Sequence, residues 1–170
     1  IDVWAKGEVS PLFLFANDVA GNANAAHKVS VLFSQAMGAT FTFNEEAGLY
    51  YKNIVYSLPT PTEIAHADED GTQLAFRNLI LLTCPVSLKP DGQVTDFDLD
   101  SGEGWYFTAG GMQKITWEKG DPQNPLLLYD EDGNMLEVQR GKIYIGVINE
   151  SVEDSVTFFS KEELARQAAV

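Results

Sequence analysis

The sequence predicts a mainly β fold: an antiparallel sheet, or two sheets curled into a sandwich or partial barrel, with a C-terminal helix. Several segments alternate apolar and polar residues with the period of two that half-buried strands show. Glycine-containing turns separate these segments, and the clearest helix signal lies near the C-terminus. At 170 residues, we expect one β-rich domain over residues 1–170 that can bury its own core.

The first strands are predicted before residue 53. Residues 29–33 and 41–43 alternate apolar with polar side chains, and an aromatic segment at 49–52 begins a third strand. Gly38 and Gly48 lie where the chain must turn between them. These three strands are expected to form an antiparallel meander.

The next segments are irregular or strongly apolar. Residues 57–70 contain two prolines and are expected to be irregular. Residues 74–83 form the most apolar run, and their length and flanking turns predict a buried strand. Cys84 ends this run and is expected to be a small core residue. Apolar runs at 1–4 and 12–15 are expected to be strands as well.

The segment from 111 to 149 predicts several strands around an acidic turn. Gly133 can adopt the positive φ that a hairpin turn needs, and the neighbouring Asp side chains can accept hydrogen bonds from the turn. The run at 143–148 has few polar positions, so we expect it inside the sheet with both faces covered. The local prediction is an antiparallel meander. Between residues 105 and 148, strands are expected at 105–107, 115–118, 126–129, 135–138 and 143–148.

The C-terminal helix is predicted by a capping box. Ser160 is followed by Glu163, so the serine hydroxyl can accept from the Glu163 N–H while the Glu163 carboxylate reaches back. We therefore expect a helix from Lys161 to about Ala168.

Composition excludes some classes of function. The chain has 11 basic and 25 acidic side chains, and 11 − 25 gives a net charge of −14. This charge repels nucleic acid and anionic lipid head groups, so neither is an expected ligand. A single cysteine allows no internal disulfide. No apolar run approaches the ~20 residues that span a bilayer.

The acidic segment around residue 98 is the first candidate site. Asp96, Asp98 and Asp100 alternate as in the start of a calcium loop. Ser101 stands where that loop has glycine and Phe107 where it has its bidentate Glu, so the segment is not an EF-hand. A looser calcium site is one interpretation, and a solvated acidic loop is the other. We therefore expect no cofactor, and calcium is the one alternative.

His66 and Asp68 form the second candidate site. A histidine two residues from an aspartate can form part of a metal site, or an acid–base pair if a nucleophile lies nearby. The alternative is a polar loop in which Asp68 caps a turn.

The third candidate site comprises Tyr51, Lys52, Arg77 and Asn78. Lys52 and Arg77 lie in otherwise apolar strands, and a buried cation needs a partner. In so acidic a protein these cations are expected to pair with carboxylates. The alternative is a small basic floor that binds an anionic or sugar ligand.

A series of short motifs follows in order from Tyr51 to Ile148. They are Tyr51-Lys52, His66-x-Asp68, Gly71, Leu74, Asn78-Leu79-Ile80, Gly102-x-Gly104, Phe107, Gly110, Thr116-Trp117-x-Lys119, Tyr129-Asp130, Asp132-Gly133 and Gly141-Lys142. Their order and spacing resemble the C-terminal domain of the YerB-like family of bacterial lipoproteins, a domain without assigned function. Lys52 stands where the family usually has arginine, and Tyr144 where it often has tryptophan.

The resemblance implies an extracytoplasmic protein of a Gram-positive-type bacterium. Its membrane anchor would be a lipid at an N-terminus upstream of this chain, and a further domain would precede it. We therefore expect the C-terminal part of a longer secreted chain: a non-catalytic binding or interaction module for a protein or a cell-envelope component. The alternatives are a hydrolase of envelope material that uses His66 and Asp68, with or without a metal, and a purely structural domain. The hydrolase predicts that both residues meet a basic residue in a concave pocket.

Overall fold

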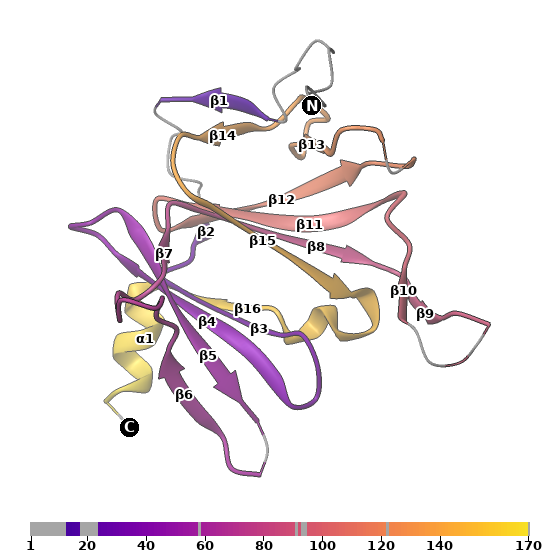
Figure 1. Ribbon diagram of the computed structural model, residues 1–170. Coiled ribbons are helices and arrows are strands. Elements are labelled where there is room, and N and C mark those ends of the chain that lie inside the picture. The colour runs from indigo at the N-terminus through magenta and orange to yellow at the C-terminus, as the bar shows by residue number, and fades with distance from the viewer. Residues whose placement is uncertain are drawn as a thin grey trace, which may run out of the picture.

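Two six-stranded sheets packed face to face dominate the computed structural model (Figure 1). The chain is mainly β, as predicted, and the packing is the sandwich among the expected arrangements. The structure describes residues 13–17, 24–57, 59–90, 92, 95–121 and 123–169.

The first sheet has the strand order β13-β12-β11-β8-β15, and β2 pairs with β12 beside this path. Neighbouring strands in this sheet are antiparallel, except that β15 runs parallel to β8. The strands are β2 (Asn24–Ala25), β8 (Asn78–Cys84), β11 (Ser101–Thr108), β12 (Gly111–Glu118), β13 (Leu127–Tyr129) and β15 (Ile143–Asn149).

The second sheet has the order β16-β3-β4-β5-β6, and β7 pairs with β5. All its pairs are antiparallel, and β3, β4 and β5 form the predicted meander. The strands are β3 (Lys28–Leu32), β4 (Met37–Asn44), β5 (Leu49–Tyr56), β6 (Thr62–Ala65), β7 (Ala75–Phe76) and β16 (Thr157–Phe159).

Two strand pairs lie outside these sheets. β1 (Leu14–Ala16) runs parallel to β14 (Glu137–Gln139) and lies over the first sheet on the side away from the second (Figure 1). β9 (Val86–Leu88) and β10 (Thr95–Phe97) form an antiparallel arm at one end of the molecule (Figure 1).

The first sheet is covered on both faces. Phe41 and Tyr50 from the second sheet pack with Leu79 and Phe107 against one face. On the other face, Val138 of β14 packs in a cluster with residues that include Ile80 and Trp117. All seven residues of β8 are therefore buried, which is why this strand reads as a continuous apolar run.

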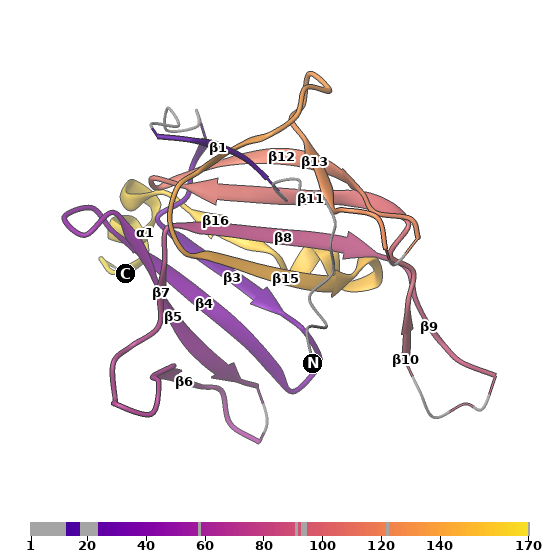
Figure 2. The same ribbon diagram turned by 45° about the horizontal axis from the view of Figure 1, so that its top comes forward.

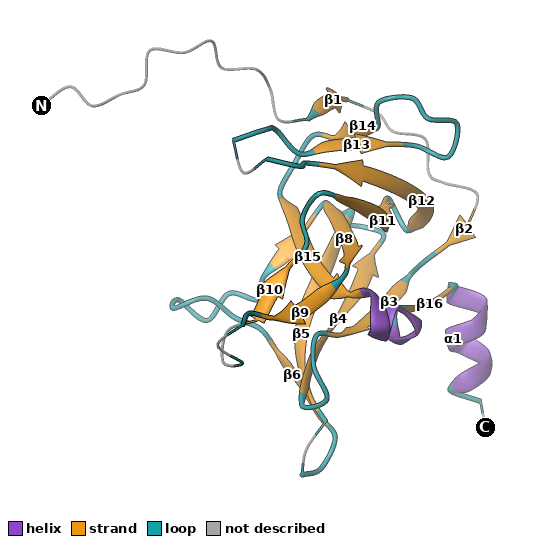
Figure 3. Cartoon of the chain, turned by 90° about the vertical axis from the view of Figure 1, so that its right-hand side faces the viewer, coloured by secondary structure: helices purple, strands orange, loops and turns teal. Residues whose placement is uncertain are grey.

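The helical elements follow β15. A 3-10 helix, η1 (Glu150–Ser155), leads into β16, and α1 (Lys161–Gln167) follows β16 at the edge of the second sheet (Figure 3). The predicted capping box is present: the Ser160 hydroxyl accepts from the Glu163 N–H, and the Glu163 carboxylate accepts from the Ser160 N–H. None of the described helices is long and apolar enough to cross a membrane.

The position predicted for residues 143–148 is wrong. These residues form most of β15, which is an edge strand of the first sheet, and Ile145 is 41% exposed. The segment from 111 to 149 is also not one meander, because β14 pairs with β1 and β15 pairs with β8. Residues 57–70, expected to be irregular, contain β6.

Other local predictions are confirmed. Gly133 has a φ of 80°, and the Asp130 carboxylate accepts from the turn N–H groups of Asp132 and Asn134. Cys84 is buried at the end of β8. The predicted strand at 1–4 lies outside the described residues, and so does residue 12 of the run at 12–15.

Candidate functional site

A hollow of about 470 Å³ lies where the chain passes from the second sheet to the first. β7 belongs to the second sheet and β8 to the first (Figure 2), and Arg77 lies between these two strands in the chain. We call this hollow the Arg77 hollow. It is lined by Leu49, Tyr51, Asp68, Thr72, Gln73, Leu74, Ala75, Arg77, Gly141 and Lys142.

Two glycines fix the position of the Arg77 side chain. A Cβ at Gly141 would lie 2.8 Å from the Arg77 Cβ, and a Cβ at Gly48 would lie 3.1 Å from Nη1. Both glycines have positive φ, at 144° and 64°, where a side chain is also strained. The Arg77 N–H donates to the Lys142 carbonyl at 2.9 Å. This bond joins two cationic residues that are 65 positions apart and brings them to one hollow.

The cations of the Arg77 hollow have no carboxylate partner within the described part of the chain. The ion pairs found there are formed by other cations, and neither Arg77 nor Lys142 takes part in one. Asp68 lines the same hollow, but its Oδ1 accepts from the N–H groups of Asp70 and Thr72 at 3.1 and 2.9 Å. Asp68 therefore caps a turn, as one interpretation of the sequence held. The expected pairing of Lys52 and Arg77 with carboxylates is not found among the residues that the structure describes.

Lys52 lies on the opposite face of β5 from Tyr51, because successive side chains of a strand alternate. Its Nζ lies 2.8 Å from Nδ1 of His66 and 5.2 Å from the ring centroid of Tyr144. Burial lowers the pKa of Lys52. Burial, and then the charge of Lys52, lower the pKa of His66. The lowered pKa favours the neutral His66 ring, whose Nδ1 can accept from the Lys52 ammonium group.

His66 is not among the residues that line the Arg77 hollow, whereas Asp68 is. The described structure therefore does not bring His66, Asp68 and a basic residue into the single concave pocket that a hydrolase of this kind requires.

Asn78 follows Arg77 in the chain, is fully buried and has a role in the fold. Its Nδ2 donates to the Gln139 carbonyl at 2.7 Å, and its Oδ1 accepts from the Tyr106 hydroxyl at 2.8 Å. The same hydroxyl accepts from the Gln139 N–H at 2.9 Å. Asn78 was predicted as a binding residue, but the structure places it away from any surface that a ligand can reach.

The acidic segment near residue 98 is open to solvent. Asp96 lies on β10, 3.9 Å from Lys89 Nζ, and Asp98 Oδ1 accepts from the Asp100 N–H at 3.2 Å. In the regions that the structure describes, no group of three or more His, Cys, Asp or Glu side chains is placed to hold a metal ion. Asp96, Asp98 and Asp100 thus form no such group.

Lys142 and Gln73 are members of the hollow that the sequence did not suggest as binding residues. The Gly141-Lys142 pair matches a family position, but its distance from Arg77 in the chain gave no sign that the two would meet. Gln73 donates to the Lys52 carbonyl at 3.0 Å and to Asn53 Oδ1 at 2.8 Å. It thereby ties one wall of the hollow to β5.

Comparison with known proteins agrees with the expected relationship. The crystal structure of the YerB protein from Bacillus subtilis superimposes with a TM-score of 0.66 at 18% sequence identity, over 87% of this chain and 47% of that chain. The present chain thus spans less than half the length of that protein. No curated protein matches the sequence. Residues 29–145, which include every residue of the Arg77 hollow, match the family described as "Protein of unknown function (DUF3048) C-terminal domain". The chain therefore belongs to this family, and the resemblance to YerB-like proteins is confirmed.

Proposed function

We propose that this chain is a non-catalytic binding module that holds an anionic sugar of the bacterial cell envelope in the Arg77 hollow. One observation carries the proposal. In a chain with a net charge of −14, Arg77 and Lys142 share a hollow and have no ion-pair partner among the described residues. Cations left free in a protein so rich in carboxylates favour an anion from outside.

The other lining residues suit a sugar. The Arg77 guanidinium can hold a carboxylate or phosphate with two parallel hydrogen bonds, and Lys142 adds a point charge. The Tyr51 ring offers an apolar surface with a polar tip. Asp68 Oδ2, which has no partner among the described residues, can accept from a sugar hydroxyl. A volume of about 470 Å³ is in the range typical of small-ligand sites.

The proposed location is outside the cell, with membrane attachment through a lipid on a part of the protein that precedes this chain. This location is the one that the resemblance to the YerB-like family implies. Envelope polymers are rich in sugars that carry carboxylate or phosphate groups, and these would be within reach of such a module.

The test is a calorimetric titration with two sugars that differ in one group. N-acetylmuramic acid carries a carboxylate that N-acetylglucosamine lacks, so we expect only the former to bind. Arg77→Gln and Lys142→Gln should each weaken its binding at least tenfold, about 1.4 kcal/mol. Lys89→Gln removes the same charge from the distant β9–β10 arm and should have no effect. Equal loss in all three variants, or equal binding of the two sugars, would show that the hollow is not the site.

The alternative function, an envelope-directed hydrolase that uses His66 and Asp68, has less support. His66 contacts Lys52 outside the hollow, and Asp68 is engaged in capping a turn. The hydrolase predicts release of soluble fragments from purified cell wall and its loss in His66→Ala. The binding module predicts no release, with sugar binding retained in His66→Ala.

A further inference from the structure

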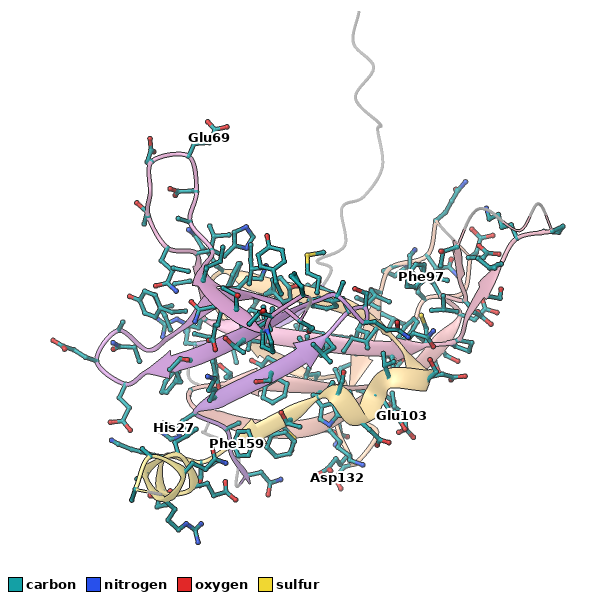
Figure 4. The ribbon with its side chains drawn as sticks, turned by 90° about the horizontal axis from the view of Figure 1, so that it is seen from below. His27, Glu69, Phe97, Glu103, Asp132 and Phe159 are labelled. Atoms are coloured by element: carbon teal, nitrogen blue, oxygen red, sulfur yellow. The ribbon has the colours of Figure 1, made fainter. Side chains whose placement is uncertain are left out.

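A second and larger cavity, of about 650 Å³, opens between the two sheets on the side of β12 and β16. We call it the β16 groove. Its floor contains Trp105 and Phe158, and its rim contains Glu103, Glu131, Glu153 and Asp154. Figure 4 shows Glu103 on the opposite side of the molecule from Glu69, the tip of the loop next to Asp68. The β16 groove is therefore separate from the Arg77 hollow, and no residue lines both.

The groove exists because the second sheet covers only part of the first. Phe158 of β16 packs edge-on against Phe107, with ring centroids 6.1 Å apart. Trp105 lies two residues before Phe107 on β11, so its side chain points to the same face. Its partner in the register is Lys114 on β12. Trp105 is thus only partly buried and gives the groove a large aromatic surface.

One side of the groove is an unpaired strand edge. β16 is the terminal strand of the second sheet, and among the described strands it pairs only with β3. Val156 and Phe158 line the groove from this edge. A free edge beside an apolar groove is the arrangement in which extended peptides add as a further strand.

The charge of the rim selects the kind of peptide. The carboxylates of Glu103, Glu131, Glu153 and Asp154 have no hydrogen-bond or ion-pair partner among the described residues. Lys114 is the one cation in the lining. A peptide with lysine or arginine side chains is complementary to this rim, and an acidic peptide is repelled.

We propose that the β16 groove binds an extended basic segment of a partner protein, which adds as a strand to the free edge of β16. Apolar side chains of the segment pack on Trp105 and Phe158, and alternate lysine or arginine side chains pair with the rim. This proposal does not depend on sugar binding in the Arg77 hollow.

The first experiment measures fluorescence anisotropy with a labelled octapeptide of alternating lysine and valine. Glu153→Lys/Asp154→Lys should weaken binding at least tenfold. The control, Glu69→Lys/Asp70→Lys, changes an adjacent pair of exposed carboxylates by the same charge on the opposite side of the molecule. If the two double variants lose affinity equally, the peptide responds only to net charge and the proposal is wrong. Thermal unfolding checks that both variants remain folded.

A second experiment tests the added strand. N-methylation of alternate backbone amides of the octapeptide keeps its charge and side chains but removes strand hydrogen bonds. We expect the peptide methylated on the face toward β16 to lose binding. We also expect the unmodified peptide to slow amide hydrogen exchange in residues 156–159. Alternate amides can be methylated in two ways, on the edge of the peptide toward β16 or on the edge away from it. If neither methylated peptide loses affinity, or if equimolar spermine displaces the peptide, the groove attracts cations without pairing to β16.

Discussion

At the scale of single residues, Asn78 shows how a polar residue in an apolar strand can serve the fold. Its side chain joins β8 to β14 through the Gln139 carbonyl and to β11 through the Tyr106 hydroxyl. Asn78→Ala removes the donor to the Gln139 carbonyl and the acceptor for the Tyr106 hydroxyl proton, and each such loss costs about 1–3 kcal/mol. We therefore expect Asn78→Ala to lower the free energy of unfolding by about 2–4 kcal/mol, measured by urea denaturation.

The control for this prediction is Tyr106→Phe, which removes the hydroxyl that Asn78 accepts from. Because both changes break the same network, the double variant should lose less than the sum of the single losses. Additive losses would mean that the Asn78–Tyr106 bond contributes nothing to stability.

Gly48 tests whether the position of Arg77 matters to a ligand. Gly48→Ala strains a residue with a φ of 64° and places a methyl group 3.1 Å from Arg77 Nη1. Gly71→Ala strains a residue with a φ of 80°, but its new methyl group meets nothing within 4 Å. Each should cost about 1 kcal/mol of stability. We expect only Gly48→Ala to weaken binding of N-acetylmuramic acid. Equal affinity in the two variants would mean that ligand binding does not depend on the position of the Arg77 side chain.

At the scale of elements, α1 is tied to the β4–β5 turn by Glu45. The Glu45 carboxylate accepts from Lys161 at 2.9 Å and lies 3.1 Å from His27 Nε2. The hydrogen bond from Lys161, and then that from His27, hold the pKa of Glu45 below its ordinary value. Because the Glu45 pKa is lower in the folded chain, ionised Glu45 stabilises the fold at pH values above the glutamate pKa of the unfolded chain, about 4.3. That contribution is lost as the pH falls through the lower pKa of the folded state.

We therefore expect α1 to loosen below about pH 4, seen by NMR as a loss of helical Cα chemical shifts in residues 161–167. Glu45→Gln removes the ion pair at every pH, so this variant should show a smaller change over the same range. Part of the pH dependence should remain, because hydrogen bonds from the Ser160 backbone and then its hydroxyl lower the pKa of Glu163 in the capping box. An identical titration in wild type and Glu45→Gln would show that the tie does not hold the helix.

The elements that the sequence predicted are those whose signals are local. Alternation marked β3 to β5, and the capping box marked α1. β6 was missed because prolines on its N-terminal side suggested an irregular segment. The edge position of β15 was missed because an apolar run predicts covered faces and does not show which strand the segment joins. Its partner β8 lies about 60 residues earlier in the chain.

At the scale of the whole molecule, the same limit applies to the candidate site. The sequence predicted Tyr51, Arg77 and Asp68 as candidate site residues, and the fold brings them to one hollow. It did not name Lys142, because the contact with Arg77 depends on the parallel pairing of β15 with β8. It also grouped Lys52 with Tyr51, although alternation along β5 sends the two side chains to opposite faces. The composition of this candidate site therefore depends on which distant segments meet between the two sheets.

The charge of the molecule makes a prediction of its own. The chain has 25 acidic and 11 basic side chains, so the excess carboxylates repel one another in the folded state. Added salt screens this repulsion, and the Debye length is about 8 Å at 0.15 M. We expect the melting temperature to rise by about 2–4 °C, equivalent to about 1 kcal/mol, between low salt and this concentration of sodium chloride. Glu69→Lys/Asp70→Lys changes the net charge by +4, from −14 to −10, and should flatten the rise. A melting temperature that falls with salt would instead mean that attraction in ion pairs such as Lys161–Glu45 outweighs the repulsion.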